Sequence, residues 1–126
     1  MPITPEQLAA SGTEHGHQAA IFCWAQQSGI AELKWLFAGP NGFFGSAAQK
    51  GKMKAEGLKL GVPDIWLPVP MDGCYGLVIE LKVGKNKPTK EQQEWIDYLN
   101  NAGYYARVRY GWESARDTIL KYLGKM

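Results

Sequence analysis

The sequence predicts an α/β fold in which helices flank a mixed four-stranded sheet, in the order α-β-β-β-α-β. Three observations predict it: capping patterns precede several helical segments, turn residues join two strand-like segments into a hairpin, and a helical segment separates the last two strands. Because strands joined through a helix pair in parallel, the sheet should combine a parallel pair with the antiparallel hairpin. With 126 residues, 45% of them hydrophobic and 21% charged, the chain (1–126) is expected to form a single domain.

The first half of the chain is expected to contain helices, one strand and a loop-rich stretch. A Thr-Pro-Glu-Gln pattern in the N-terminal extension, 1–12, starts a short helix, and another Thr starts a second helix over 13–27. Segment 32–37, ELKWLF, is a strand candidate. The region 38–61 is rich in Gly and Lys and should be mostly loop, with a short helix at 46–56.

The second half is expected to contain the hairpin, a helix, a strand and a last helix. Segments 64–69 and 76–83 are rich in Val, Ile, Leu and Trp, and PMDGCY between them supplies the turn. Prolines in the first of these strands cannot donate to a ladder, so that strand should lie partly at an edge or end early. The capping signature PTKEQ starts a helix that runs to about residue 101. An alternating strand follows at 104–110, and the last helix covers about 113–123.

Two charged residues emerge from a strand that otherwise looks buried. Glu80 and Lys82 are two residues apart, so they share one face of the strand, and the residues beside them in the sequence are apolar. Burying charges is costly unless they are paired or bind a metal. If the turn is centred near Asp72, Asp64 and Glu80 each lie eight residues from it and face each other. Carboxylates about 5 Å apart repel, and a shared divalent cation would remove that penalty. Oxygen ligands of this kind suit Mg²⁺ or Mn²⁺.

Asp64, Glu80 and Lys82 together meet the requirements of phosphodiester hydrolysis. The reaction needs a metal as Lewis acid, an activated water and a cation near the phosphate, and Lys82 can orient or deprotonate the water and stabilise negative charge. The alternative is a structural Glu–Lys pair on an edge strand, because an isolated Glu-x-Lys is common. The upstream Pro-Asp at hairpin spacing favours the catalytic interpretation. That interpretation depends on register, since a slip of one residue would turn Asp64 to the opposite face.

Three further polar residues are candidates for the site. On the second helix, Glu14 and Gln18 share a face with Ile21 and Ala25, and this stripe is expected to face the sheet. Glu14 is therefore a candidate metal or water ligand; alternatively, it is an acid in the first helical turn, where the helix dipole favours it. Gln92 completes a capping box, and its pattern leaves open whether it also reaches the site.

Positive charge is concentrated in the middle of the chain, although the net charge is only +2. Residues 34–90 carry nine lysines against four acids, and two of those acids are the candidate metal ligands. Such a field suits a phosphate backbone, although an ordinary solvated lysine face would produce the same composition. The candidate DNA-binding residues are Lys50, Lys52, Lys54, Lys85, Lys87, Arg107 and Arg109.

Three segments, which carry four motifs in order, resemble the VRR-NUC family, the virus-type replication-repair nucleases of the PD-(D/E)XK superfamily. They are EHGHQAAIFCWA (14–25), GVPDIWLPVP (61–70) and GLVIELKVGKNKPTKEQQEWIDYLNNAGYYARV (76–108). The resemblance spans roughly residues 14 to 122 and implies a restriction-endonuclease-like core.

The resemblance also implies roles for individual residues. Asp64 and Glu80 would bind the metal together with the backbone carbonyl of Leu81, and Lys82 would be catalytic. Glu14 matches the family's first-helix glutamate, which adds to the metal and catalytic set. Gln92 matches the family's glutamine after the S/T-P-E-Q-like segment and is a candidate catalytic residue, and Gln18 matches the helix position that follows the glutamate and is a candidate supporting residue.

The function that the resemblance implies is structure-selective cleavage of DNA with Mg²⁺ or Mn²⁺. Stand-alone members, known from phages and prophages, are associated with branched DNA such as four-way (Holliday) junctions, and other members are nuclease modules of larger DNA repair proteins. One chain carries one motif set, so cutting two strands would require a C2 homodimer. The alternative is a nuclease-fold module that binds DNA without cutting it.

The remaining residue types point to an ordinary protein of a reducing compartment. Two cysteines form no disulfide framework, so we expect a reducing cytoplasm, and the resemblance to phage and prophage proteins implies that of a bacterial or phage-infected cell. No apolar run approaches the roughly 20 residues of a membrane span. Zinc binding is a further hypothesis, but the spacing lacks the paired pattern of structural zinc sites; the residues concerned are His15, His17, Cys23 and Cys74. Phe43 and Phe44 could stack on bases or pack their loop onto the body.

Overall fold

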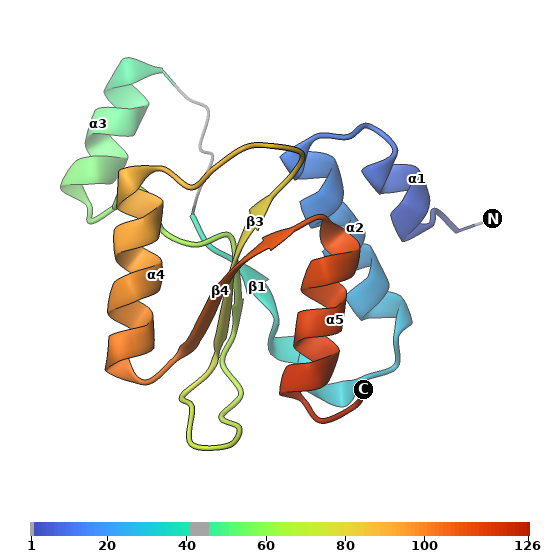
Figure 1. The fold of residues 1–126 in the computed structure, drawn as a ribbon. Helices are drawn as coiled ribbons and strands as arrows, with labels where there is room; N and C mark the ends of the chain where they lie inside the picture. Colours follow the sequence, from blue (N-terminus) through green and yellow to red (C-terminus); the bar gives the residue numbers. More distant parts are fainter. Residues whose placement is uncertain (1, 41–45) are drawn as a thin grey trace.

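The computed structural model describes residues 2–40 and 46–126. Phe43 and Phe44 lie outside these ranges. Figure 1 shows the elements in chain order: α1 (Pro5–Ala9), α2 (Glu14–Gln27), the 3₁₀ helix η1 (Ala31–Trp35), β1 (Phe37–Ala38), α3 (Ala47–Ala55), β2 (Ile65–Leu67), β3 (Leu77–Lys82), α4 (Lys90–Ala102), β4 (Tyr105–Tyr110) and α5 (Trp112–Tyr122).

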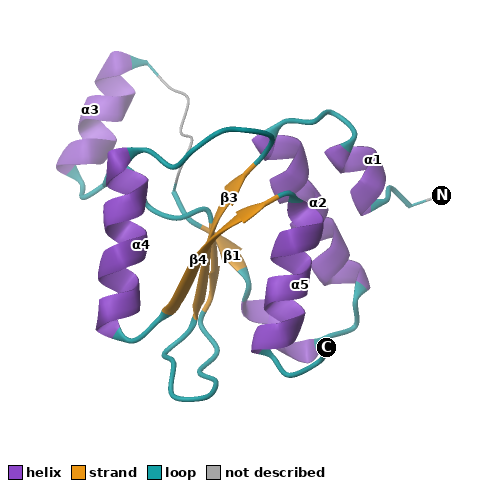
Figure 2. Ribbon diagram, viewed as in Figure 1, coloured by secondary structure: helices purple, strands orange, loops and turns teal. Residues whose placement is uncertain are grey.

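A single mixed sheet lies at the centre of this fold. Its strand order is β1-β2-β3-β4, with antiparallel pairing of β2 to β1 and to β3, and parallel pairing of β3 to β4. Figure 2 shows α4 on one side of the sheet and α2 with α5 on the other. The predicted α/β fold with a mixed four-stranded sheet is therefore confirmed, including the crossover through α4.

Strand β3 alternates between two hydrophobic cores. The larger core, shared with α2 and α5, takes Leu77, Ile79 and Leu81. The smaller core beneath α4 takes Val78. Because successive side chains of a strand point to opposite faces, Glu80 and Lys82 lie on the same face as Val78, towards α4.

Helices α1, α2 and α4 begin where the capping patterns predict. Thr4, Ser46 and Thr89 each form a capping box with a Gln three residues later, and Thr13 accepts a hydrogen bond from the backbone of the third residue after it. These bonds satisfy N–H groups that the first turn of a helix leaves without partners. At the other end, α4 stops at Gly103, whose φ of 108° suits glycine.

The predicted strand over 32–37 is wrong for most of its length. The structure has the 3₁₀ helix η1 here, and only Phe37 of this segment enters β1. The buried side chains are Leu33 and Leu36, which both join the larger core. Their spacing of three residues is the repeat of a 3₁₀ helix rather than the two-residue repeat of a strand.

The hairpin between β2 and β3 has the register that the sequence predicts. Ile65 pairs with Ile79 and Leu67 with Leu77, which is the alignment expected for a turn near Asp72. As the prolines predict, β2 ends early, at Leu67.

None of the helices in residues 2–40 and 46–126 has the length and hydropathy that a membrane crossing requires.

We expect Gly61→Ala to destabilise the protein more than Gly29→Ala. Both glycines have left-handed φ values, +79° and +73°, which cost an L residue about 1–2 kcal/mol. A Cβ at Gly61 would also lie 2.6 Å from the carbonyl carbon of Glu91 in α4, whereas a Cβ at Gly29 meets nothing within 4 Å. Overpacking of this kind adds about 1–3 kcal/mol. Urea unfolding compares the two variants, and equal losses of stability would contradict the close approach of this segment to α4.

Candidate active site

The candidate site lies where β2 begins and β3 ends. Asp64 directly precedes β2, and the pairing of Ile65 with Ile79, extended by one residue, places Asp64 opposite Glu80. The structure describes both side chains as buried, Asp64 at 9% and Glu80 at 1% exposure. The predicted register therefore holds, and both carboxylates come from neighbouring strands at the same end of the sheet.

Asp64 continues the hydrogen bonding of the sheet beyond the last backbone pair of β2. Its Oδ2 accepts a hydrogen bond of 2.8 Å from the backbone N–H of Leu81. Neighbouring residues of a strand direct their backbone groups to opposite edges, and the carbonyl of Lys82 accepts from Gly111, which follows β4. The carbonyl of Leu81 is consequently directed to the β2 side, where Asp64 lies.

The carboxylate of Glu80 is buried without a hydrogen-bond donor. Neither Oε1 nor Oε2 has a hydrogen-bond partner among the described residues, and the nearest cation, Nζ of Lys82, lies 3.5 Å from Oε2. Burial raises the pKa of Glu80 to about 9, with further raising contributions from the charge of Asp64 and from the proton that the two carboxyls can share. Lys82 acts in the opposite direction but does not compensate.

Lys82 lies between two carboxylates. Its Nζ is 3.5 Å from Oε2 of Glu80 and 3.9 Å from Oε1 of Glu14, in the first turn of α2. The other oxygen of Glu14, Oε2, accepts a hydrogen bond of 3.2 Å from Nδ2 of Asn86. The structure thus brings Glu14, which the sequence offers as a metal or water ligand, close to Lys82. It also adds Asn86, which sequence reasoning missed because a lone Asn in a lysine-rich loop has no distinguishing pattern.

The two candidate glutamines lie on the helices that border the site. Gln92 is buried at the start of α4, where its Oε1 accepts from the backbone N–H of Thr89. Gln18 is half-buried on α2, one turn after Glu14. Their catalytic and supporting roles, and the role of Glu14 as a metal ligand, remain predictions.

The donor set at this site fits a divalent cation. Asp64 and Glu80 offer oxygen atoms from two facing carboxylates, the carbonyl of Leu81 is directed to the same side, and Glu80 otherwise has no donor to compensate its charge. In the part of the chain that the structure describes, no group of three or more His, Cys, Asp or Glu side chains could hold a metal. A cation held by these two carboxylates and the backbone oxygen would complete its coordination with water, a set that suits Mg²⁺ or Mn²⁺.

The same finding bears on the zinc hypothesis. His17 uses Nδ1 to accept a hydrogen bond from the backbone N–H of Trp112, at the start of α5. Cys23 donates to the carbonyl of Ile3, and both Cys23 and Cys74 are free thiols. No zinc cluster forms among the described residues.

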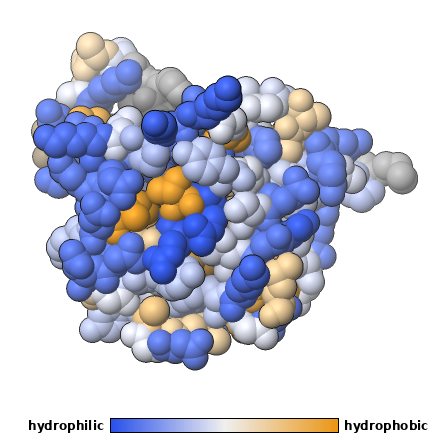
Figure 3. Space-filling view, viewed as in Figure 1, coloured by the Kyte–Doolittle hydropathy of each residue, from blue (hydrophilic) through white to orange (hydrophobic). Residues whose placement is uncertain are grey.

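The candidate DNA-binding residues fall into two groups. Five lysines are exposed, three on α3 and two in the loop between β3 and α4: Lys50, Lys52, Lys54, Lys85 and Lys87. Hydrophilic side chains also cover much of the face seen in Figure 3. The two arginines of β4 are half-buried and hydrogen-bonded. Arg107 stacks on Tyr105 with its guanidinium carbon 3.8 Å from the ring centre, and it donates to Asn100.

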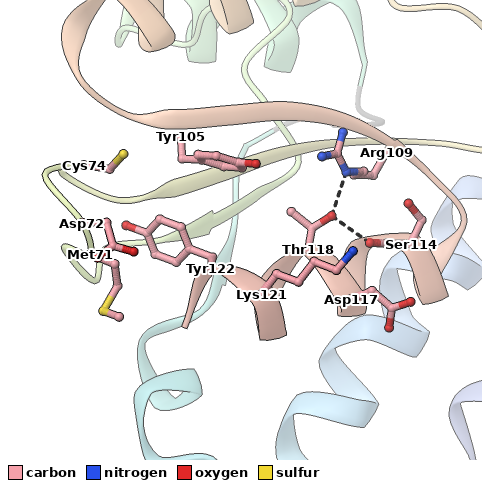
Figure 4. A pocket seen from close by; sticks show the side chains of 10 residues that line it. All are labelled: Met71, Asp72, Cys74, Tyr105, Arg109, Ser114, Asp117, Thr118, Lys121 and Tyr122. Carbon is pink, nitrogen blue, oxygen red and sulfur yellow. Dashed lines mark hydrogen bonds between the residues drawn. The ribbon is translucent and has the colours of Figure 1, made fainter. Parts of the chain in front are cut away.

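Arg109 belongs to a different part of the molecule from the carboxylate pair. Its Nε donates to Oγ1 of Thr118 on α5 at 2.7 Å. Both residues line a cavity between β4, α5 and the β2–β3 hairpin (Figure 4), and its volume is about 680 Å³. Asp64, Glu80 and Lys82 do not line this cavity, because they lie on the α4 side of the sheet.

The metal-free protein should become less stable as pH rises from about 5 to about 9. The unfolded carboxyl of Glu80 has a pKa of 4.5, whereas the pKa in the folded protein is about 9, so the folded state binds an extra proton between these values. The stabilisation from this proton is complete at pH values below the pKa of Glu80 in the unfolded chain. It is lost as pH rises towards the pKa of Glu80 in the folded protein, with a slope of at most about 1.4 kcal/mol per pH unit.

Urea unfolding in the presence of a chelator measures this slope. Glu80→Gln should flatten it, whereas Glu113→Gln, at an exposed position of α5, should leave it unchanged. A parental protein whose stability does not fall over this pH range would contradict the raised pKa.

Comparisons with known proteins agree with the fold and the motifs. The model of the VRR-NUC domain family matches residues 13–112. A solved structure described as a VRR_NUC domain protein superposes with a TM-score of 0.77 at 26% sequence identity, over 89% of this chain and 88% of that chain. None of the curated proteins compared with the chain matches it. Since the family model covers most of the sequence, including every residue of the carboxylate site, the chain belongs to the VRR-NUC family.

Proposed function

We propose that this VRR-NUC protein is a divalent-metal-dependent DNA endonuclease that hydrolyses phosphodiester bonds with Asp64, Glu80 and Lys82. The family is a nuclease family, and the observation that carries the proposal here is the buried carboxylate of Glu80. It faces Asp64, has no hydrogen-bond donor among the described residues and has an ammonium group 3.5 Å away. A purely structural site would gain nothing from burying Glu80 opposite a second carboxylate and without a hydrogen-bond donor of its own.

Each residue has a defined task in the proposed reaction. Asp64, Glu80 and the carbonyl of Leu81 hold the cation, and Glu14 is an additional candidate ligand. When bound, Mg²⁺ or Mn²⁺ supplies Lewis acidity towards the phosphate and lowers the pKa of bound water. Lys82 orients or deprotonates the attacking water and stabilises negative charge that develops on the phosphate. Gln92 is assigned to orienting the reacting groups, and Gln18 to supporting Glu14.

The proposed substrate is branched DNA, including four-way junctions. The exposed lysines of α3 and of the loop after β3 would contact the phosphate backbone, while Arg107 and Arg109 would have to leave their present partners to do so. Because the described residues of each chain form one carboxylate site, paired incision of a junction requires two copies, and we propose a C2 homodimer.

The alternative proposal is a nuclease-fold module that binds DNA without cutting it. It requires the lysines but gives no role to a buried carboxylate pair. The two proposals differ in what the loss of Asp64 should do, since binding by surface lysines does not depend on it.

Asp64→Asn and Lys82→Ala should each lower the rate of DNA cleavage by at least about 100-fold while leaving DNA affinity nearly unchanged. Asp64→Asn removes a metal ligand, and Lys82→Ala removes the cation beside the phosphate. Labelled duplex, flap and four-way-junction DNAs, incubated with and without Mg²⁺ or Mn²⁺, measure the rate. Lys121→Ala, an exposed lysine on α5, is the control. Cleavage by Asp64→Asn at the parental rate would overturn the endonuclease proposal.

Replacement of Lys50, Lys52 and Lys54 together by Ala should weaken DNA binding and reduce its salt dependence. Each lysine that contacts a phosphate contributes about 0.9 to the slope of log K against log salt concentration on duplex DNA. Titrations between 50 and 200 mM salt measure the slope for the parent and the variant. An unchanged slope would show that α3 does not contact the phosphate backbone.

A further inference from the structure

The loop between β3 and α4 connects the carboxylate site to the edge strand β4 through Asn86. The loop turns directly after Lys82, with Gly84 at a φ of 59° and the backbone N–H of Asn86 donating to the carbonyl of Val83 at 3.3 Å. This turn places Asn86 beside the first turn of α2. Asn86 then makes two contacts, one through its side chain and one through its backbone.

The side chain of Asn86 holds Glu14. Nδ2 donates to Oε2 of Glu14 at 3.2 Å, and because a carboxylate can only accept, the amide nitrogen must be the atom that faces it. The other oxygen of Glu14 lies 3.9 Å from Nζ of Lys82. One carboxylate therefore bridges Asn86 and Lys82, and its orientation towards Lys82 depends on the contact from Asn86.

The backbone of Asn86 is held by Tyr110. The hydroxyl of Tyr110 donates to the carbonyl of Asn86 at 2.7 Å. Tyr110 pairs with Lys82 in the parallel register of β3 and β4, and the residue after it, Gly111, donates to the carbonyl of Lys82 at 2.8 Å. Tyr110, which holds the loop, and Lys82 therefore occupy paired positions on neighbouring strands.

We propose that Asn86 is a positioning residue of the active site: anchored by Tyr110, it orients Glu14 so that Lys82 is held between Glu14 and Glu80. The expected effect of Asn86 on catalysis rests on the proposed nuclease function. Its effect on the position of Lys82 can be measured without any enzymatic activity. Asn86 and Tyr110 are exposed, so their hydrogen bonds contribute little to the stability of the fold. Their replacement is expected to disturb Lys82 without unfolding the protein.

The experiment has an activity-independent arm, in which amines are acetylated and the rate at each lysine is followed by mass spectrometry of peptides. In the parent, Lys82 is buried at 6% exposure and should react slowly. Asn86→Asp keeps the shape of the side chain but replaces the donor by a carboxylate that repels Glu14. We expect it to raise the acetylation rate of Lys82 about fivefold, relative to Lys121 in the same digest, with Asn86→Ala having a similar effect. Asn101→Asp, at an exposed position of α4, is the matched control.

The kinetic arm measures kcat and KM for DNA cleavage. Asn86→Asp should lower kcat about 10-fold with KM unchanged, because outer partners of a site typically contribute 10- to 100-fold. In a Glu14→Gln background the same change should have no further effect, since the two residues act through one contact. Tyr110→Phe should lower kcat by less, and Tyr98→Phe, at an exposed tyrosine of α4, should have no effect.

The two arms separate the two proposals. An unchanged acetylation rate of Lys82 in Asn86→Asp, or effects of Asn86 and Glu14 on kcat that simply multiply, would overturn the positioning role. A raised acetylation rate in a protein that cleaves no DNA would retain the positioning role and remove the nuclease function.

Discussion

The site depends on one constraint: two carboxylates from neighbouring strands are buried face to face at the end of a sheet. Glu80 belongs to a strand whose six residues are all buried, so its ionised form cannot be solvated, and the charge of Asp64 disfavours that form further. Several local features follow from this arrangement. Asp64 stands at the start of β2, where its side chain takes over the hydrogen bond of Leu81 that a longer strand would have provided. Lys82 supplies partial compensation, and Glu14 balances Lys82 in turn.

The strength of this constraint explains why much of the site could be predicted from the sequence. Alternation in β3 determines that Glu80 and Lys82 share a face, whatever the surrounding structure. The predicted register of the β2–β3 hairpin was also correct, although the turn is not centred where it was expected. The turn is a two-residue one, with Asp72 and Gly73 at φ values of 48° and 82° and with Met71 bridged to Cys74, so its centre lies half a residue beyond the expected position. The chain absorbs that offset between Leu67 and Met71, after β2 has ended, and the register of β2 with β3 is preserved. The starts of α1 and α4 were predicted for an equally local reason, because each capping box involves residues only three positions apart.

What could not be predicted depends on contacts between distant segments. The segment ELKWLF has strand-like composition, but burial of Leu33 and Leu36 against the larger core selects a 3₁₀ helix instead. The position of Arg109 beside Thr118 follows from how α5 packs on β4, which no short pattern encodes. The contacts of Asn86 join residues 72 positions apart on one side and 24 on the other. The return of the β3–α4 loop to the site could be predicted only if the pairing of Lys82 with Tyr110 in the sheet were already known.

The most direct test of the shared-cation account is the proton balance of metal binding. Because burial beside Asp64 raises the pKa of Glu80 to about 9, the metal-free protein carries a proton there at neutral pH, and a cation that ligates Glu80 must displace it. Calorimetric titration with Mn²⁺ at pH 7 in buffers of different ionisation enthalpy counts the protons released. The account predicts close to one proton per bound ion in the parent and none in Glu80→Gln. Binding of the ion to the parent without proton release would contradict it.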